Sequence, residues 1–303
     1  MHVLNRYIVY TGYMHDTTFN YNEAFSRNIG LLTEDEQKEL RTKKIVIAGM
    51  GGVGGAHLIS LVRQGFEYFK IADPDVFENK NINRQFGART DTLGRRKVDI
   101  MKEEALKINP LCQIEVWPDE VTEENIDQFL SGADLFVDGL DAFALTARRM
   151  SFMKAHAKKI PVITAGPIGF GVAYLIFMPD GPSFDSYFGI TDGMNERDMT
   201  IRFFIGLLPK LLQRTYMKNT SLDEKRGPSS IGAVNLCAGV VAISVVKILL
   251  KKGTVYPVPY YHQFDLMHDR YVRGRLLFGN YGLLQQLKIR LAPHIERWHN
   301  KVD

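Results

Sequence analysis

The chain has 303 residues, of which 45% are hydrophobic, and a formal net charge of +4. This length and composition suffice for one large α/β domain or two smaller ones, and the mild charge gives no indication of a nucleic-acid partner. The two cysteines, Cys112 and Cys237, lie far apart without a Cys-x-x-Cys pair, which excludes a cysteine-built zinc site and suits a cytoplasmic protein.

Residues 1–44 precede the first predicted strand. Residues 1–25 are aromatic and polar, with neither a clear period nor the apolar segment of a secretion signal, and we expect a partly extended lead-in. A helix is predicted to begin after Thr33, because threonine is a good N-cap and Glu36, three residues later, completes a capping box.

The stretch from residue 44 to residue 97 has the pattern of a nucleotide-binding unit. An apolar run over residues 45–48 leads through a glycine-rich turn into helical apolar spacing. A second apolar run ends at Asp73, 24 positions after Gly49, the separation expected for a carboxylate that faces a ribose. Glycines let a phosphate approach the backbone N–H groups of a helix N-terminus. The residues of this predicted cradle are Gly49, Gly51, Gly52, Val53 and Gly54.

Two cations follow at a spacing that suits a triphosphate. Arg84 and Lys97 lie 13 residues apart, beyond the predicted ribose carboxylate. A guanidinium can bind two phosphoryl oxygens at once, and an ammonium supplies a point charge. A nicotinamide-dependent oxidoreductase would use the same glycine turn and Asp73 without this role for the cations, so it remains an alternative.

Residues 113–141 alternate between strand and helix patterns. Strands are predicted over residues 114–117 and 135–138, with a helix over residues 122–130 between them, which favours a mainly parallel sheet. Asp138 and Asp141 then lie at the carboxyl end of a strand, where open α/β sheets bind ligands. Capping of the following helix is the alternative role for Asp141.

A helix over residues 144–158 and two strands joined by a glycine-rich bend, within residues 160–177, are predicted next. Residues 181–228 form a variable insertion, in which residues 201–217 have near-helical apolar spacing that Pro209 interrupts or starts. Such an insertion is a candidate substrate-binding cap. Core packing, dimer packing or a membrane-surface helix are the alternatives.

Residues 229–303 are predicted to complete the same domain. A buried helix is expected over residues 231–250, whose most apolar part, residues 236–250, is too short to span a bilayer. A strand over residues 260–265, basic segments and a final amphipathic helix follow.

Two cysteines and two histidines are considered as candidate nucleophiles or general bases. Cys112 and Cys237 lie among apolar residues, which favours buried thiols over nucleophiles. His262 and His268 are interpreted as hydrogen-bonded scaffold, with general bases as the alternative.

Five ordered motifs resemble those of the ThiF/MoeB/HesA family of adenylyltransferases, which are related to the ubiquitin-activating enzymes. The motifs are Asp73-x-Asp75, Asn81-x-x-Arg84-Gln85, Lys97, Ile108-Asn109-Pro110 and Asp138-x-x-Asp141. The resemblance implies an α/β, Rossmann-like fold with a mainly parallel sheet flanked by helices and an antiparallel C-terminal extension of the sheet. It implies an N-terminal lead-in and helix over residues 1–44, an ATP-binding domain over residues 45–180, the insertion over residues 181–228, and a C-terminal part over residues 229–303.

The resemblance also implies the members of the site. ATP and Mg²⁺ are expected as cofactors, without zinc, and Asp141 is expected to hold Mg²⁺ by way of ATP. The arginine that matches Arg27 crosses a homodimer interface to the partner's triphosphate, and Arg27, Arg84, Lys97 and Asp141 are the expected catalytic residues. The expected nucleotide-binding residues are Gly49, Gly51, Gly52, Val53, Gly54, Asp73, Asp75, Asn81, Arg84, Gln85, Lys97 and Leu140.

The expected activity is ATP-dependent adenylation of a substrate carboxylate, with release of pyrophosphate. The carboxylate donor is a ubiquitin-like or sulfur-carrier protein, a peptide or a small molecule, and the sequence does not choose among them. A non-catalytic nucleotide-binding partner subunit is the second alternative, although the retention of Arg27, Asp73, Arg84, Lys97 and Asp141 argues against it.

Overall fold

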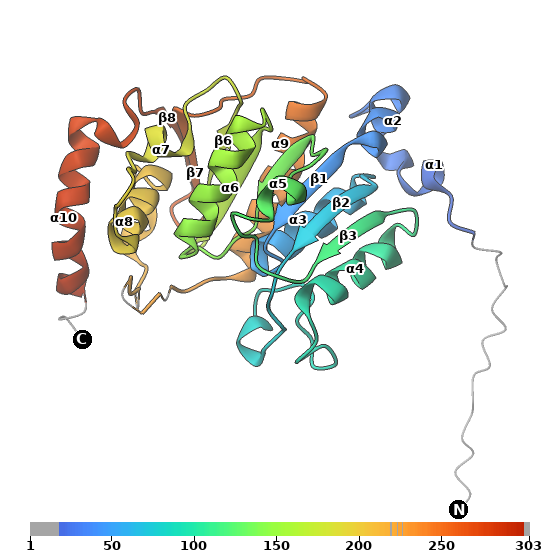
Figure 1. Cartoon of the computed structure of the whole chain (residues 1–303), viewed down its shortest axis with the longest axis horizontal. Helices are drawn as coiled ribbons and strands as arrows, with labels where there is room; N and C mark the ends of the chain where they lie inside the picture. Colours follow the sequence, from blue (N-terminus) through green and yellow to red (C-terminus); the bar gives the residue numbers. More distant parts are fainter. Residues whose placement is uncertain (1–17, 219, 223, 226, 300–303) are drawn as a thin grey trace, which may run out of the picture.

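The computed structural model describes residues 18–218, 220–222, 224–225 and 227–299 (Figure 1). Eight strands form one sheet in the order β3-β2-β1-β4-β5-β6-β7-β8. The strands are β1 (Lys44–Ala48), β2 (Tyr68–Ala72), β3 (Gln113–Trp117), β4 (Leu135–Asp138), β5 (Val162–Ile168), β6 (Gly171–Phe177), β7 (Tyr260–Asp265) and β8 (Arg270–Arg275). The predicted fold class is confirmed, because β1 to β5 pair in parallel and β6, β7 and β8 extend the sheet antiparallel.

Helices cover both faces of the sheet. The longer helices are α2 (Glu34–Thr42), α3 (Gly52–Arg63), α4 (Lys97–Ile108), α6 (Leu145–Ala157), α8 (Glu196–Leu207), α9 (Ile231–Leu249) and α10 (Leu283–His299). The short ones are α1 (Tyr21–Ala24), η1 (Ser26–Asn28), η2 (Asn79–Asn81), α5 (Ile126–Phe129), α7 (Phe184–Phe188), η3 (Leu212–Thr215) and η4 (Gly279–Tyr281).

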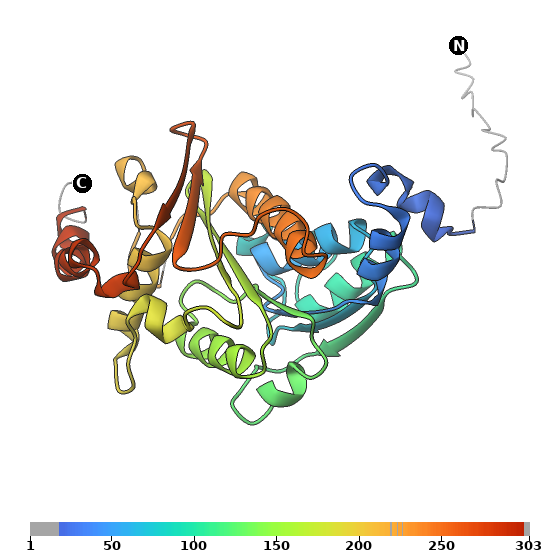
Figure 2. The same ribbon diagram turned by 90° about the horizontal axis from the view of Figure 1, so that it is seen from above.

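The core has two layers because successive strand residues point to opposite faces. In β1, Ile45 and Ile47 pack with α3, α4 and α9, whereas Val46 and Ala48 pack with α5 to α8. Figure 2 shows α3 and α9 on one side of the sheet and α5 and α6 on the other. Helices α1 and α10 lie at opposite ends of the long axis (Figure 1).

Several sequence predictions hold at the level of single elements. The capping box at α2 is present, since Thr33 Oγ1 accepts from the Glu36 N–H and Glu36 Oε2 accepts from the Thr33 N–H. The strand pair over residues 160–177 forms the β5–β6 hairpin, which turns at Gly169 with φ of +59°. Most of the expected lead-in, residues 1–17, lies outside the described residues.

Two helix predictions are corrected. In place of a helix over residues 122–130, α5 has four residues, because Asn125 Oδ1 accepts from the Thr122 N–H and closes a turn instead. In the insertion, α8 lies over residues 196–207 in place of 201–217. Asn195 caps its start, and Pro209 prevents its continuation.

The helix predicted over residues 231–250 is confirmed as α9. The length argument from residues 236–250 alone was wrong, because the whole helix is long enough to span a membrane. Its 19 residues and mean hydropathy of 2.1 meet the length and composition of a span. However, α9 packs on α3, β5 and β6, and Val241 and Val245 are fully buried. An apolar helix of this kind is expected inside an α/β domain. The basic segment predicted after the strand of residues 260–265 is itself a strand, β8.

Candidate active site

The glycine turn between β1 and α3 packs closely against the end of β4. Gly49 has φ of +90°, and a Cβ there would lie 2.1 Å from the Gly139 carbonyl oxygen. A Cβ on Gly54 would lie 1.8 Å from the Gly49 oxygen, so only glycine fits at either position. Gly51 is the N-cap of α3 and provides no side-chain cap. The N–H groups of the first helical turn are therefore available to an anion.

Asp73 fixes the shape of this turn. Its carboxylate accepts from the N–H of Met50 at 2.6 Å and from the N–H of Asp75 at 2.9 Å. Asp73 is buried, and burial raises the pKa of its carboxyl above the ordinary value, while the Lys97 ammonium opposes that shift. The structure thus gives Asp73 a role in holding the backbone of the glycine turn, in addition to the predicted contact with a ribose.

The two predicted phosphate-binding cations have different surroundings. Lys97 begins α4 and is buried, with its ammonium 2.7 Å from Asp75 and 3.8 Å from Asp73. Arg84 donates to the Lys80 carbonyl oxygen and to Asn83 Oδ1. Among the described residues it has no carboxylate partner, so its positive charge is not neutralised by a neighbouring side chain.

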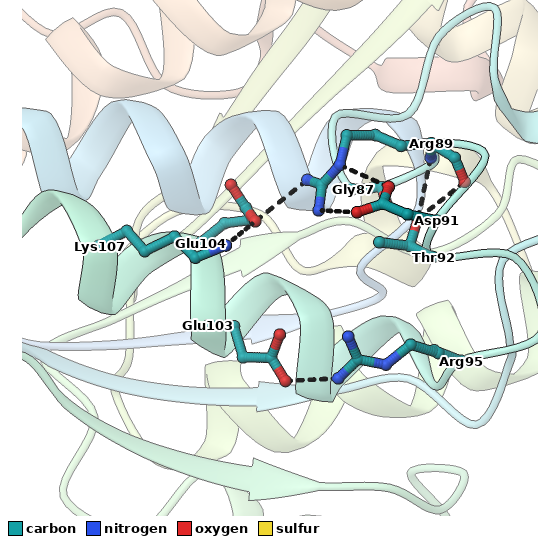
Figure 3. Close-up of polar contacts among 8 residues, drawn as sticks. All are labelled: Gly87, Arg89, Asp91, Thr92, Arg95, Glu103, Glu104 and Lys107. Carbon is teal, nitrogen blue, oxygen red and sulfur yellow. Dashed lines mark hydrogen bonds and ion pairs between the residues drawn. The ribbon is translucent and has the colours of Figure 1, made fainter.

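The loop between Arg84 and Lys97 is tied to α4. Thr92 Oγ1 donates to the Gly87 carbonyl oxygen at 2.6 Å, and Arg89 bonds Glu104 at 3.0 Å (Figure 3). Arg89 also pairs with Asp91, and Arg95 with Glu103, as the dashed lines in Figure 3 show. These bonds restrain the loop that carries both cations.

Arg148 is a site residue that the sequence prediction missed. It is buried and donates to Asp138 Oδ2 at 2.7 Å and to the Leu140 carbonyl oxygen at 2.8 Å. The same guanidinium donates to the carbonyl oxygen of Asp141 at 3.0 Å. Arg148 thereby neutralises Asp138 and shapes the loop after β4. The sequence feature that could have identified Arg148 is its place in the helix that follows Asp138, ten residues further along the chain.

Asp141 differs from Asp138 because it is exposed. One of its oxygens, Oδ1, accepts from the Phe143 N–H at 2.9 Å, in a turn that precedes α6. The N-cap position of α6 itself is occupied by Ala144. The carboxylate of Asp141 therefore has capacity for a further partner at the cavity wall.

The predicted site residues surround part of one cavity of about 1380 Å³. What we call the nucleotide half is lined by Gly49, Gly51, Gly52, Val53, Asp73, Asp75, Arg84, Gln85, Lys97, Leu140 and Asp141. The insertion half, which the sequence prediction did not resolve, is lined by Phe204, Leu207, Leu208, Leu211, Gln213, Arg214, Met217, Lys288 and Leu291. The cavity thus joins the glycine turn to the insertion and to α10.

Three predicted residues do not line this cavity. Gly54 lies beneath the turn, and Asn81 is buried with Oδ1 accepting from the Glu78 N–H. Arg27 is exposed in η1, away from the cavity of its own chain. A contact of Arg27 with a triphosphate would therefore have to be with that of another subunit.

The two cysteines are buried, as predicted. Burial raises the pKa of Cys112 to about 12 and raises the pKa of Cys237 as well, so both thiols stay protonated. His262 is buried and hydrogen-bonded to Tyr271, and His268 contacts Asp265, as expected of scaffold histidines. Among the described residues, no group of three or more His, Cys, Asp or Glu side chains is arranged to hold a metal ion.

Comparison with known proteins identifies the family. The model of the ThiF family matches residues 25–278. The chain is 34% identical over 151 residues to tRNA threonylcarbamoyladenosine dehydratase of Haemophilus influenzae, covering 50% of the chain and 57% of that relative. It is 27% identical over 157 residues to sulfur carrier protein ThiS adenylyltransferase of Escherichia coli, covering 51% of the chain and 62% of that relative. The chain thus spans little more than half the length of these curated relatives.

Solved structures support the same fold. Escherichia coli MccB, crystallised with AMPCPP and MccA, has a TM-score of 0.65 and 18% identity, and the match covers 88% of this chain and 75% of that one. At this level of identity the likeness concerns the fold alone. The family match, in contrast, spans most of the chain and includes every motif described above. The chain belongs to the ThiF family.

Proposed function

We propose that the protein is an ATP-dependent adenylyltransferase, which activates a substrate carboxylate as an acyl-adenylate and releases pyrophosphate. The observation that carries the proposal is the nucleotide half of the cavity, where the uncapped N-terminus of α3 lies with Arg84 and Lys97. Family membership supports the same activity, since a relative is named an adenylyltransferase.

The residues of the nucleotide half fit ATP. The first turn of α3 offers N–H donors to phosphates, and Arg84 and Lys97 offer positive charge. Gln85 is buried at the cavity wall, and its Oε1 has no hydrogen-bond partner among the described residues. Asp73 and Asp75 are the proposed ribose-side residues, and Leu140 also lines the nucleotide half.

Asp141 is the proposed anchor for Mg²⁺. Magnesium keeps several waters and is commonly held by one or two carboxylates together with substrate phosphates. The exposed carboxylate of Asp141 fits that ligand set. When bound, the ion would neutralise phosphate charge.

In the proposed reaction, an oxygen of the substrate carboxylate attacks the α-phosphorus of ATP in line. The bond between that phosphorus and the oxygen that leads to the β-phosphate breaks, and pyrophosphate leaves with the electron pair. Arg84 and Lys97 stabilise the negative charge that develops on the phosphoryl and pyrophosphate oxygens. Because the substrate supplies the nucleophile, this step needs no cysteine or other protein nucleophile.

The carboxylate donor is proposed to be a ubiquitin-like or sulfur-carrier protein, a peptide or a small molecule. The names of the relatives support this range, since one is a ThiS adenylyltransferase and MccB was crystallised with MccA. The activated acyl group then passes to a thiol, sulfide or amine, or to a group within the substrate itself, and AMP leaves. We further propose a cytoplasmic homodimer in which Arg27 reaches the partner's triphosphate.

Equilibrium titration with ATP and with NADH tests the nucleotide assignment. We expect ATP to bind and NADH at similar concentration not to compete, with ATP affinity falling in Arg84→Ala. Tighter binding of NADH would favour a nicotinamide-dependent oxidoreductase. ATP binding without carboxylate-dependent turnover, in the presence of its partners, would favour the non-catalytic subunit.

A further inference from the structure

The insertion half of the cavity has chemistry of its own, and an inference about it rests on the proposed function. Its walls come from α8, from η3 and the segment before it, and from α10. They are mostly apolar, with Leu207 and Leu208 buried in the second core layer. A small number of polar groups in such a wall is what fixes the orientation of a ligand.

Gln213 is the most unusual of these polar groups. Only 2% of the residue is exposed, and neither its Oε1 nor its Nε2 has a hydrogen-bond partner among the described residues. A buried polar atom without a partner is costly, and native proteins retain few of them. The residue lines the cavity, and its carboxamide can donate through Nε2 and accept through Oε1.

Two cations accompany Gln213. Lys288 of α10 donates to the Pro209 carbonyl oxygen at 2.7 Å and to Gln285 Oε1 at 2.8 Å, which leaves one of its three N–H donors for a ligand. Arg214 follows Gln213 and is exposed at the wall. Neither cation has a carboxylate partner among the described residues, so this part of the cavity favours an anion.

The three side chains together define a ligand class. A carboxamide both donates and accepts, so its best partner is another amide, whose N–H and C=O complement it. An apolar acid offers no such pair, and a carboxylate only accepts. A cationic wall adds a requirement for negative charge beyond the carboxylate that reacts with ATP.

We infer that the insertion half binds an acidic peptide segment of the carboxylate donor. Gln213 pairs with a backbone amide of this segment, and Lys288 and Arg214 pair with an acidic side chain. Gln213 is thus a specificity-determining residue, which selects polypeptide donors over simple carboxylic acids.

Affinity selection with mass spectrometry tests this inference on the full chain in the presence of AMPCPP. The probes are pooled tetrapeptides with free carboxyl ends and one glutamate, the same pool with glutamine for glutamate, the same pool with N-methylated amides, and a mixture of glutarate and hexanoate. We expect retention of the glutamate pool at least about tenfold above the other three pools.

The variants separate the two kinds of contact. Gln213→Leu should lose at least about tenfold in retention of the glutamate pool without a lower melting temperature, since leucine fills the site without unpaired atoms. Gln213→Glu, a second variant, should also reject this pool by charge. Lys288→Met should remove the preference for glutamate over glutamine, whereas Arg290→Met, an exposed cation of α10 outside the cavity lining, should change nothing.

Unchanged retention of the glutamate pool in both Gln213 variants would overturn the inference. Retention of glutarate and hexanoate equal to that of the glutamate pool would overturn it as well. Absence of any retained peptide, in wild-type protein that binds ATP, would overturn it too while leaving the nucleotide assignment in place. Failure of the wild-type protein to bind ATP would instead overturn the proposed function itself.

Discussion

At the scale of single residues, the site is held by buried groups whose charges are matched by specific partners. Asp138 has Arg148, and Asp73 has two backbone N–H groups and a nearby Lys97. Removing one partner of such a set leaves an uncompensated buried charge, which costs far more than the net contribution of the pair. Three buried residues outside this set, one histidine and two cysteines, allow sharp tests of what burial does.

His57 is expected to lower the free energy of unfolding as the pH falls below about 6.5. It is fully buried in α3 with no partner for either ring nitrogen among the described residues, and burial lowers its pKa from 6.5 to about 3. The unfolded chain binds the proton more readily, so stability is complete above pH 6.5 and falls as pH drops toward 3, by about 1.4 kcal/mol per pH unit.

His57→Leu should flatten this dependence. Urea denaturation at pH 7 and pH 5 should give a difference of about 2 kcal/mol in wild type from this residue, and a smaller difference in the variant. His156→Gln, at a partly exposed histidine, is the matched control and should keep the wild-type difference. An identical pH dependence in His57→Leu would contradict the account.

The cysteines should be dispensable. Because both thiols are buried and their pKa values are raised, neither supplies a thiolate near neutral pH. The double variant Cys112→Ala and Cys237→Ala should retain carboxylate-dependent adenylation within about twofold. A folded double variant that forms acyl-adenylate but no longer transfers the acyl group would show that a thiol takes part.

At the scale of elements, sequence prediction succeeded where an element is determined by local sequence features and failed where it depends on other features of the chain. β1, α3 and α2 have local determinants, namely an apolar run, a glycine turn and a capping box, and they were predicted. The insertion was predicted poorly. The start of α8 is set by its N-cap at Asn195 and its end by Pro209, whereas the apolar spacing shows only the helical face and not these limits.

The capping box offers a test at this scale. Thr33→Ala removes the acceptor of the Glu36 N–H, and the unfolding free energy should fall by about 1 kcal/mol. Thr42→Ala, at the last residue of α2, is the control for loss of a threonine side chain from the same helix. Equal effects of the two substitutions, measured by urea denaturation, would show that the cap itself contributes little.

At the scale of the whole molecule, the nucleotide half and the insertion half of the cavity come from distant parts of the chain. Arg148 and Gln213 meet the glycine turn at one cavity only after the sheet and α10 are assembled. No spacing in the sequence brings these residues together, which is why the motifs predicted the nucleotide half and left the insertion half open.

Arg27 tests the proposed sharing of sites between subunits. If Arg27 acts on the partner's triphosphate, then Arg27→Ala and Lys97→Ala should each be inactive as homodimers. Mixing them should restore activity to about a quarter of wild type, because each heterodimer contains one complete site. No recovery on mixing, with subunit exchange verified by differently sized tags, would contradict sites shared across a homodimer.

The most direct test of the central proposal is exchange of radiolabelled pyrophosphate into ATP, which requires reversible attack of a carboxylate on the α-phosphorus. With pools of peptides and carrier proteins as donors, we predict exchange in wild type that depends on the donor. Arg84→Ala and Lys97→Met should lower it by about a hundredfold or more, while Lys102→Met in the middle of α4 should not. Full exchange in Arg84→Ala and Lys97→Met, or exchange without any carboxylate donor, would contradict the account.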